Sequence, residues 1–225
     1  MILYSLPISN YSGKVLHAIR FKDLECEVLP PPGGYGSDEY KKIVASGTIP
    51  ALDHDGIILS ESEVINEYLN EIHPEPNLLP GSLENRASIR MLCRFHDLKL
   101  EPIVRSLFPA MSPDKRDSGL VEKRFEDMNQ ALKYLRNQIR PNPFLMGDSP
   151  SLADCAYSQT LMLAQMMWDE LGSPLALGEE LEHWQNMMAG LDPVNSVLEP
   201  AREATKTWLA GKRDAAKEFM NQASV

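Results

Sequence analysis

Three polar side chains with possible chemistry stand together early in the chain, at Ser9, Asn10 and Ser12. They follow an apolar run, Met1 to Leu6, and begin a segment whose apolar residues recur at helical spacing. Such side chains cap helix starts, and after a strand of an open α/β sheet they also face approaching ligands. A hydroxyl that points outward there could donate a hydrogen bond to a ligand thiolate, with the helix N-terminus adding a favourable potential.

A second candidate is the Ser-Glu-Ser-Glu run from Ser60 to Glu63. Ser60 and Glu63 have capping-box spacing, and as an isolated motif the run favours that structural role. The alternative is a binding role, in which backbone N–H groups and the Ser62 hydroxyl gather a carboxylate while the Glu61 side chain receives an ammonium. The end group of an amino acid carries both of these charges.

The step from Ile49 to Pro50 is the third candidate. A proline at the start of a strand is usually a structural stop, and cis bonds are a small minority of such steps. If this bond is cis, the Ile49 N–H and C=O turn outward and can pair with an extended peptide as an added strand.

Other motifs favour structural roles. Ser151 and Asp154 have capping spacing before an apolar helical segment, so we expect them to stabilise a buried helix start. His96 and His183 have no Cys or carboxylate partner in a motif, and we expect surface or packed residues.

The elements that would position the candidates follow from the changing period of the apolar residues. A helix between the first two strands predicts a parallel pair, and Asp55-Gly56 predicts a hairpin. The predicted order is βαβαββα. Its parts are a strand at 1–6, a helix at 9–24, a strand near 25–30, a short helix at 37–44, two strands around the hairpin, and a helix from 60 that ends before Pro74.

Residues 74–82 concentrate proline, glycine and asparagine, which indicates a linker. We therefore predict one domain over residues 1–80 and an all-helical domain over residues 81–225. Proline and glycine breaks separate the candidate helices of the second domain. These lie near Glu84–Phe108, Gly119–Ile139, Leu152–Leu171, Gly178–Gly190 and Pro200–Met220.

Composition excludes several classes of function. The 225 residues carry 22 Lys and Arg against 32 Asp and Glu, a formal net charge of −10, which repels phosphate backbones and anionic lipid. Nucleic acid and membrane partners are therefore not expected. Cys26, Cys93 and Cys155 are far apart with no CxxC motif, which predicts reduced thiols and no metal site. With no basic leader and no bilayer-length apolar run, we expect a cytoplasmic protein.

Taken together, these features resemble a cytosolic glutathione transferase over essentially the whole chain. The resemblance rests on the βαβαββα half, on "SGTIPAL" followed by "SESEVINEYL", on the Pro-rich linker, and on "FLMGDSPSLADCAYS" in a helical half. It implies a thioredoxin-like N-terminal domain, an all-α C-terminal domain, glutathione as the co-substrate and a homodimer.

The resemblance also implies how glutathione lies. Its cysteinyl backbone would pair with Ile49 before a cis Pro50, and Glu61 and Ser62 would hold its γ-glutamyl group. The Ile-Pro step and the acidic run would then bind the same tripeptide.

The start of the first helix is most similar to classes with a serine after the first strand, the zeta, theta and tau type. This places Ser9 on the serine that steadies the thiolate, and three neighbours stay open as alternatives: Ser12, Asn10 and Tyr11. The neighbourhood departs from the zeta signature S-S-C-S-x-R-V, which argues against a maleylacetoacetate isomerase. Asn10, Tyr11, Gly13 and Lys14 stand where Ser, Cys, an aromatic residue and Arg would be.

A further departure is Thr48, where many relatives carry Lys or Gln. Lys41 or Lys42 in the preceding helix would then meet the glycine carboxylate of glutathione, since an anionic tripeptide needs a local cation on an acidic chain.

The implied function is an enzyme that activates the thiol of glutathione for attack on a small hydrophobic electrophile. Isomerisation, dehalogenation and peroxidase chemistry need the same thiolate. The alternative from another class is a non-catalytic glutathione-binding or interaction protein on the same fold. The electrophile would meet residues such as Phe95, Leu107, Phe108, Met111 and Trp208, all of which also suit an ordinary core.

Overall fold

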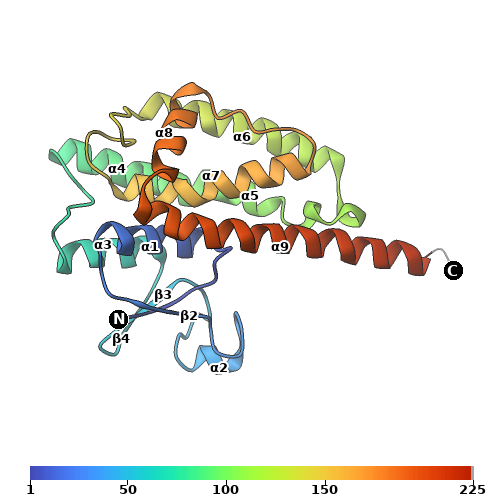
Figure 1. Cartoon of the computed structure of the whole chain (residues 1–225), viewed down its shortest axis with the longest axis horizontal. Helices are drawn as coiled ribbons and strands as arrows, with labels where there is room; N and C mark the ends of the chain where they lie inside the picture. The colour runs from blue at the N-terminus through green and yellow to red at the C-terminus, as the bar shows by residue number, and fades with distance from the viewer. Residues whose placement is uncertain (224–225) are drawn as a thin grey trace.

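The structure is a computed structural model that describes the backbone of residues 1–223 and the side chains of residues 1–216. Figure 1 shows a small sheet with its own helices and, above it, a layer of longer helices. The last helix runs along the junction of the two layers and out to one side. The element order in the first half is βαβαββα, as predicted, and the second half is helical.

The sheet has the strand order β2-β1-β3-β4. Strands β1 and β2 are parallel, and β3 is antiparallel to both β1 and β4, so the predicted parallel pair and hairpin are confirmed. Asp55 and Gly56 form the hairpin turn with φ values of 52° and 86°, which the Asp-Gly pair tolerates. The strands are β1 (Ile2–Tyr4), β2 (Glu27–Leu29), β3 (Ala51–His54) and β4 (Ile57–Ser60).

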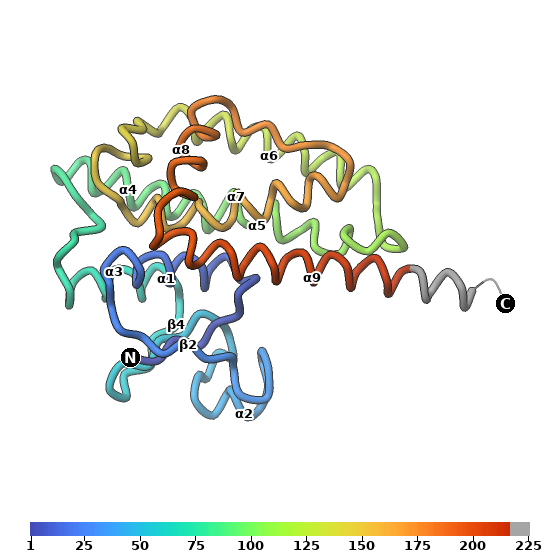
Figure 2. The backbone as a smooth tube through the Cα atoms, viewed as in Figure 1, coloured from blue at the N-terminus to red at the C-terminus, as the bar shows by residue number. Residues whose placement is uncertain are grey.

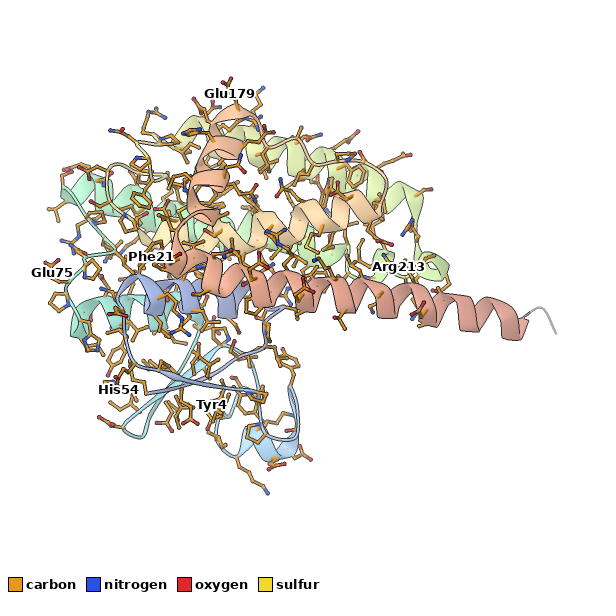
Figure 3. All side chains as sticks on the ribbon, viewed as in Figure 1. Tyr4, Phe21, His54, Glu75, Glu179 and Arg213 are labelled. Atoms are coloured by element: carbon orange, nitrogen blue, oxygen red, sulfur yellow. The ribbon has the colours of Figure 1, made fainter. Side chains whose placement is uncertain are left out.

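Alternation along the strands gives the sheet two apolar faces. Leu3 and Leu52 point to one face, where they pack with α1 (Asn10–Phe21) and α3 (Ser62–Ile72). Tyr4 points to the other face and meets Tyr40 of α2 (Asp38–Lys41) edge-on, with ring centroids 5.4 Å apart. Figure 3 labels Tyr4 at the sheet and Phe21 above it, against the helical layer. Helix α1 therefore lies between the sheet and the helical half.

Helix α7 (Leu152–Glu170) is the central helix of the helical half and packs directly on α1. Nearly all of its residues are buried. Gly13 permits the close approach, because a Cβ at this position would lie 2.0 Å from the side-chain oxygen of Gln159. The capping box predicted for Ser151 and Asp154 is present at the start of α7, where Asp154 also accepts a hydrogen bond from the Trp184 indole at 2.8 Å.

The remaining helices agree broadly with prediction, with two corrections. They are α4 (Leu83–Phe95), the π-helix η1 (His96–Leu100), α5 (Glu101–Ser106), the short 3₁₀ turns η2 (Pro109–Met111) and η3 (Pro113–Lys115), α6 (Ser118–Gln138), α8 (Glu179–Ala189) and α9 (Asp192–Ala223). The single helix predicted to Phe108 contains the π-helical turn η1. The helix predicted from Pro200 begins at Asp192 instead, and Pro200 lies inside it on an exposed face, where water can reach the carbonyl that loses its N–H partner.

Residues 73–82 connect α3 to α4 without a helix or strand, and Figure 2 follows this connection along one edge of the molecule. The nearly buried Lys22 anchors it, because its ammonium donates to the carbonyls of His73 and Pro76, both at 2.7 Å. Within the described residues, no helix is long and apolar enough to cross a membrane.

Candidate active site

A cavity of about 580 Å³ opens where the sheet half meets the helical half. We call its sheet side the first wall, formed by residues 6, 8–11, 35, 48–50 and 61–64. The opposite side is the second wall, formed by Arg94, Asp97, Leu98, Glu101, Arg105 and Phe108. The three candidate motifs of the sequence thus meet in one cavity.

Ser9 is the N-cap residue of α1 and lines the first wall. Its hydroxyl oxygen accepts the backbone N–H of Ser12 at 3.2 Å. Because a hydroxyl both accepts and donates, this bond leaves the Ser9 proton free for a ligand in the cavity. Capping and ligand binding are therefore compatible roles, and the positive end of the α1 dipole favours an anion there.

The alternatives Ser12 and Asn10 are placed differently from Ser9. Ser12 has no exposed surface and is not part of the cavity lining. Asn10 is in the lining but only 2% exposed, and its amide makes no hydrogen bond to any described residue. Ser9 thus presents the accessible hydroxyl at this helix start.

Tyr11, the remaining alternative, lines the cavity with its hydroxyl already engaged. The hydroxyl donates to a carboxylate oxygen of Glu101 at 3.0 Å. Burial and the nearby Glu101 charge raise the pKa of Tyr11 far above its ordinary value. A phenol that donates to a buried carboxylate has no second proton for a thiolate.

The Ile49-Pro50 bond is cis and lies directly before β3, with both residues in the cavity lining. The loop is anchored from beneath, because the Tyr40 hydroxyl donates to the Thr48 carbonyl at 2.9 Å. The Thr48 hydroxyl pairs with that of Ser46 at 2.7 Å. No described residue hydrogen-bonds to the Ile49 N–H or C=O, so both groups are available to an extended ligand.

Glu61 and Ser62 stand at the start of α3 and line the cavity. Glu61 is the N-cap, with φ of 75°, a backbone conformation that costs free energy for an L residue and that clusters at ligand-binding turns. The capping box considered for Ser60 and Glu63 is absent, because Ser60 still belongs to β4 and the helix begins at Ser62. The Glu63 carboxylate instead contacts the ammonium of Lys14.

Lys41 and Lys42 lie outside the cavity lining. Both are exposed, and the carbon chain of Lys41 lies close to Gly47. The cations that line the cavity are Arg94 and Arg105, both from the helical half.

Two domain families match the chain. The first, described as "Glutathione S-transferase, N-terminal domain", matches residues 3–77, and the second, the corresponding C-terminal domain, matches residues 101–192. A maleylacetoacetate isomerase of Dictyostelium discoideum is 32% identical over 164 residues, 68% of this chain and 74% of that protein. The chain belongs to the glutathione transferase family. A probable glutathione S-transferase of Nicotiana tabacum is 28% identical over 205 residues, 87% of this chain and 86% of that protein.

Solved structures share the fold of this transferase chain. A delta-class glutathione transferase of Nilaparvata lugens has a TM-score of 0.80 at 19% identity, over 94% of this chain and 99% of that one. A maleylacetoacetate isomerase of Anaeromyxobacter dehalogenans, with dicarboxyethyl glutathione and citrate bound in its active site, has a TM-score of 0.70 at 27% identity, over 89% and 91% of the two chains. The predicted family and fold class are confirmed, and glutathione is the co-substrate of this family.

The second wall of the transferase contains residues that sequence reasoning missed. Glu101 is 1% exposed and binds the Arg105 guanidinium through two hydrogen bonds of 3.2 and 2.6 Å. The guanidinium lies 5.4 Å from the centre of the Tyr11 ring and 5.8 Å from that of Phe108. The Glu-Arg spacing of four along a predicted helix was a usable signal, whereas the contact with Tyr11 joins segments far apart in sequence.

The residues expected around the electrophile are only partly brought together. Phe108 lines the cavity, and the Trp208 ring packs against the Phe108 ring with centroids 5.0 Å apart. Leu107 and Met111 are fully buried in the helical core. Phe95 packs on Tyr134 in a separate groove between α4 and α6. Helical periodicity selects buried positions, and these coincide with a cavity wall only where the packing leaves a gap.

Proposed function

We propose that this transferase binds glutathione along the first wall and activates its thiol for attack on an electrophile held by the second wall. The observation that carries the proposal is the meeting of Ser9, the Ile49 backbone and the Glu61-Ser62 turn in one cavity. In this arrangement Ser9 donates a hydrogen bond to the thiolate, Ile49 pairs with the cysteinyl backbone, and Glu61 with Ser62 holds the γ-glutamyl group.

The free energies of a hydrogen bond and of a helix N-terminus are together large enough to activate the thiol. Lowering a thiol pKa by about two units needs about 2.7 kcal/mol of differential stabilisation. A hydrogen bond to a charged group supplies about 1.5 to 3 kcal/mol, and a helix N-terminus adds about 0.3 to 1 kcal/mol. The Ser9 hydroxyl at the start of α1 combines both contributions, so no general base is needed.

The electrophile half of the proposal rests on the chemistry of the second wall. Leu98 and Phe108 offer apolar surface, and Arg105 offers a guanidinium that lies over the Tyr11 and Phe108 rings. A small hydrophobic electrophile with an oxygen acceptor suits this combination, because the ring contacts fix the guanidinium while part of it faces the cavity.

An ultraviolet titration of enzyme-bound glutathione tests the proposal, with wild type compared with Ser9→Ala and Ser9→Thr. We expect wild type to lower the thiol pKa, Ser9→Ala to lose the shift while still binding, and Ser9→Thr, which keeps a hydroxyl and a cap, to retain most of it. Binding with an unshifted thiol in wild type would instead support a non-catalytic glutathione-binding protein. Absence of binding would contradict the proposal as a whole.

A second candidate reaction is glutathione-dependent isomerisation of an unsaturated acid, supported by two observations. Relatives named maleylacetoacetate isomerase are 32% and 28% identical to this chain. Arg94 and Arg105 also place two cations in the cavity. In such a reaction the thiolate adds to one alkene carbon, the resulting single bond rotates, and the thiolate leaves again. Recovery of glutathione unchanged beside an isomerised substrate would distinguish this reaction from transfer.

The proposal includes assembly into a homodimer and a cytoplasmic location. Three apolar side chains of α3 and α4 that lie outside the cavity lining are exposed, which supports a contact with a second copy. They are Ile72, Leu83 and Met91. Light scattering should give twice the chain mass of 25.2 kDa, and cell fractionation tests the location.

A further inference from the structure

A single buried cation joins the two walls of the cavity from behind. Lys14 of α1 has no exposed surface, and its ammonium lies 2.5 Å from a carboxylate oxygen of Glu63. The same ammonium donates to both carboxylate oxygens of Asp97 at 3.0 Å. Glu63 belongs to the first wall and Asp97 to the second, so helices α1, α3 and η1 meet on one charge.

The contacts of Asp97 fix its direction as well as its charge. Its carboxylate accepts from the Nδ1 atom of His96 at 2.8 Å, which assigns the ring proton to Nδ1. The other ring nitrogen, Nε2, then accepts from the Thr160 hydroxyl of α7 at 2.8 Å. Burial alone would raise the pKa of Asp97, but the His96 bond and the Lys14 charge hold it below its ordinary value. The π-helical turn of η1 thus places the ionised Asp97 carboxylate at the cavity in a fixed orientation.

The other titratable groups around this cluster do not balance its charge within the core. Burial raises the pKa of both the Cys93 and the Cys155 thiols, so these groups are neutral, and burial lowers the pKa of His96. Arg94 reaches Asp97 only at 4.0 Å from a largely exposed position, and Arg90 is bound to Glu67. Two carboxylates and one buried cation leave one net negative charge beside the Glu61-Ser62 turn.

We propose that Lys14 is a positioning residue for the ammonium end of glutathione: bound to the buried Glu63 carboxylate on one side, it holds the Asp97 carboxylate fixed at the cavity, so that the ligand ammonium meets an oriented anion. This inference rests on the proposed function, because it requires the γ-glutamyl group to bind at the start of α3. It assigns to Lys14 a role without any contact to the ligand.

Removal of the Lys14 ammonium should make the affinity for the ligand depend on pH. Without Lys14, two carboxylates with little exposed surface would face each other, and one of them would take up a proton near neutral pH. An arriving ammonium would expel that proton. Ligand affinity would then rise with pH, by at most about tenfold per pH unit for one proton released.

The test is calorimetric titration of S-methylglutathione into wild type and Lys14→Met between about pH 5.5 and pH 7.5, in buffers of different ionisation enthalpy. The blocked thiol removes the proton release of thiol activation. We expect wild type to bind with flat affinity and no net proton exchange, and Lys14→Met to release protons with affinity rising with pH. Lys123→Met, an exposed lysine on α6, is the matched control and should behave as wild type.

Each failure has a separate meaning. Flat affinity without proton release in Lys14→Met would overturn the inference and leave the proposed function standing. Absence of S-methylglutathione binding in wild type would overturn both. If Lys14→Met does not fold, the charge-balanced double variant Lys14→Met/Glu63→Gln carries the test: the inference expects at least severalfold weaker binding with flat pH dependence, and unchanged binding overturns it.

Discussion

The two walls of the cavity are built by different means. The first wall uses local backbone features: Ser9 caps α1, Ile49 presents free backbone groups, and Glu61 sits at φ 75° before α3. The second wall uses long side chains that bind one another, with Glu101 binding an Arg105 guanidinium that lies over the Phe108 ring and over the Tyr11 ring of the first wall. The difference suits a fixed co-substrate on one side and a variable electrophile on the other, because backbone groups stay in place when side chains change.

The largest expected effect is on the first wall alone. Replacing Ser9 with Ala should lower kcat/KM by about 100-fold below neutral pH, equivalent to the two pKa units, or about 2.7 kcal/mol, assigned to thiol activation. The KM for the electrophile should not change, because Ser9 does not contact the second wall. Steady-state kinetics with a chlorodinitrobenzene electrophile at saturating glutathione measure both quantities. A rise in the KM for the electrophile as large as the fall in kcat/KM would show that the two walls do not act separately.

The next effect concerns the stability of α1, the helix that lies between the two halves of the molecule. His17 on α1 is fully buried, neither ring nitrogen bonds to a described residue, and burial lowers its pKa from 6.5 to about 3. Because the unfolded state takes up the proton first, the free energy of unfolding should fall as pH drops below 6.5, by about 1.4 kcal/mol per unit until the folded pKa is reached.

His17→Met should remove this contribution, which amounts to about 2 kcal/mol at pH 5. Urea unfolding of wild type and variant at pH 7 and pH 5 gives the comparison. Parallel losses of stability in the two proteins would show that His17 titrates as in the unfolded chain. Unfolding of the two walls in separate urea transitions would contradict the interpretation that α1 supports both.

A smaller effect should be confined to the second wall. Arg105→Met should raise the KM for an oxygen-bearing electrophile by about tenfold, or about 1.4 kcal/mol, and leave glutathione affinity unchanged. Arg105→Lys should not restore the KM, because an ammonium cannot reproduce the paired bonds to Glu101. A wild-type KM in Arg105→Met would mean that the apolar side chains alone select the electrophile.

The smallest effect tests the contact between the halves. Gly13→Ala would place a Cβ 2.0 Å from the Gln159 oxygen and disturb the bond from Gln159 to the Pro7 carbonyl, 2.9 Å long. The clash costs about 1 to 3 kcal/mol and the better helix propensity returns up to about 1, so we expect a net loss of about 1 kcal/mol. Gly211→Ala on the exposed side of α9 has open space and should be stabilising. Thermal unfolding of the pair measures the difference, and equal shifts would disprove the close contact.

Some features of the fold could be predicted from the sequence because they are local. The Asp55-Gly56 hairpin, the Ser151 capping box and the parallel β1-β2 pair each follow from residues close in sequence, and all are confirmed. Where two local interpretations competed, the sequence could not choose: a capping box of Ser60 and Glu63 stood against a ligand-binding role for Glu61 and Ser62 until the extent of β4 was known. The division of the chain at residue 80 and the ligand contacts of the site residues stay predictions.

The sequence by itself determined the order of elements, the family and the segments that carry the first wall, because periodicity, turn dipeptides and capping residues act over a few residues. Only the tertiary structure decided the rest. It buried Ser12, turned Lys41 and Lys42 away from the cavity, and brought Asp97, Glu101 and Arg105 opposite Ser9. Lys14 could not be assigned from sequence, because its partners Glu63 and Asp97 lie far along the chain and only the packing of α1 against α3 and η1 makes a buried lysine favourable.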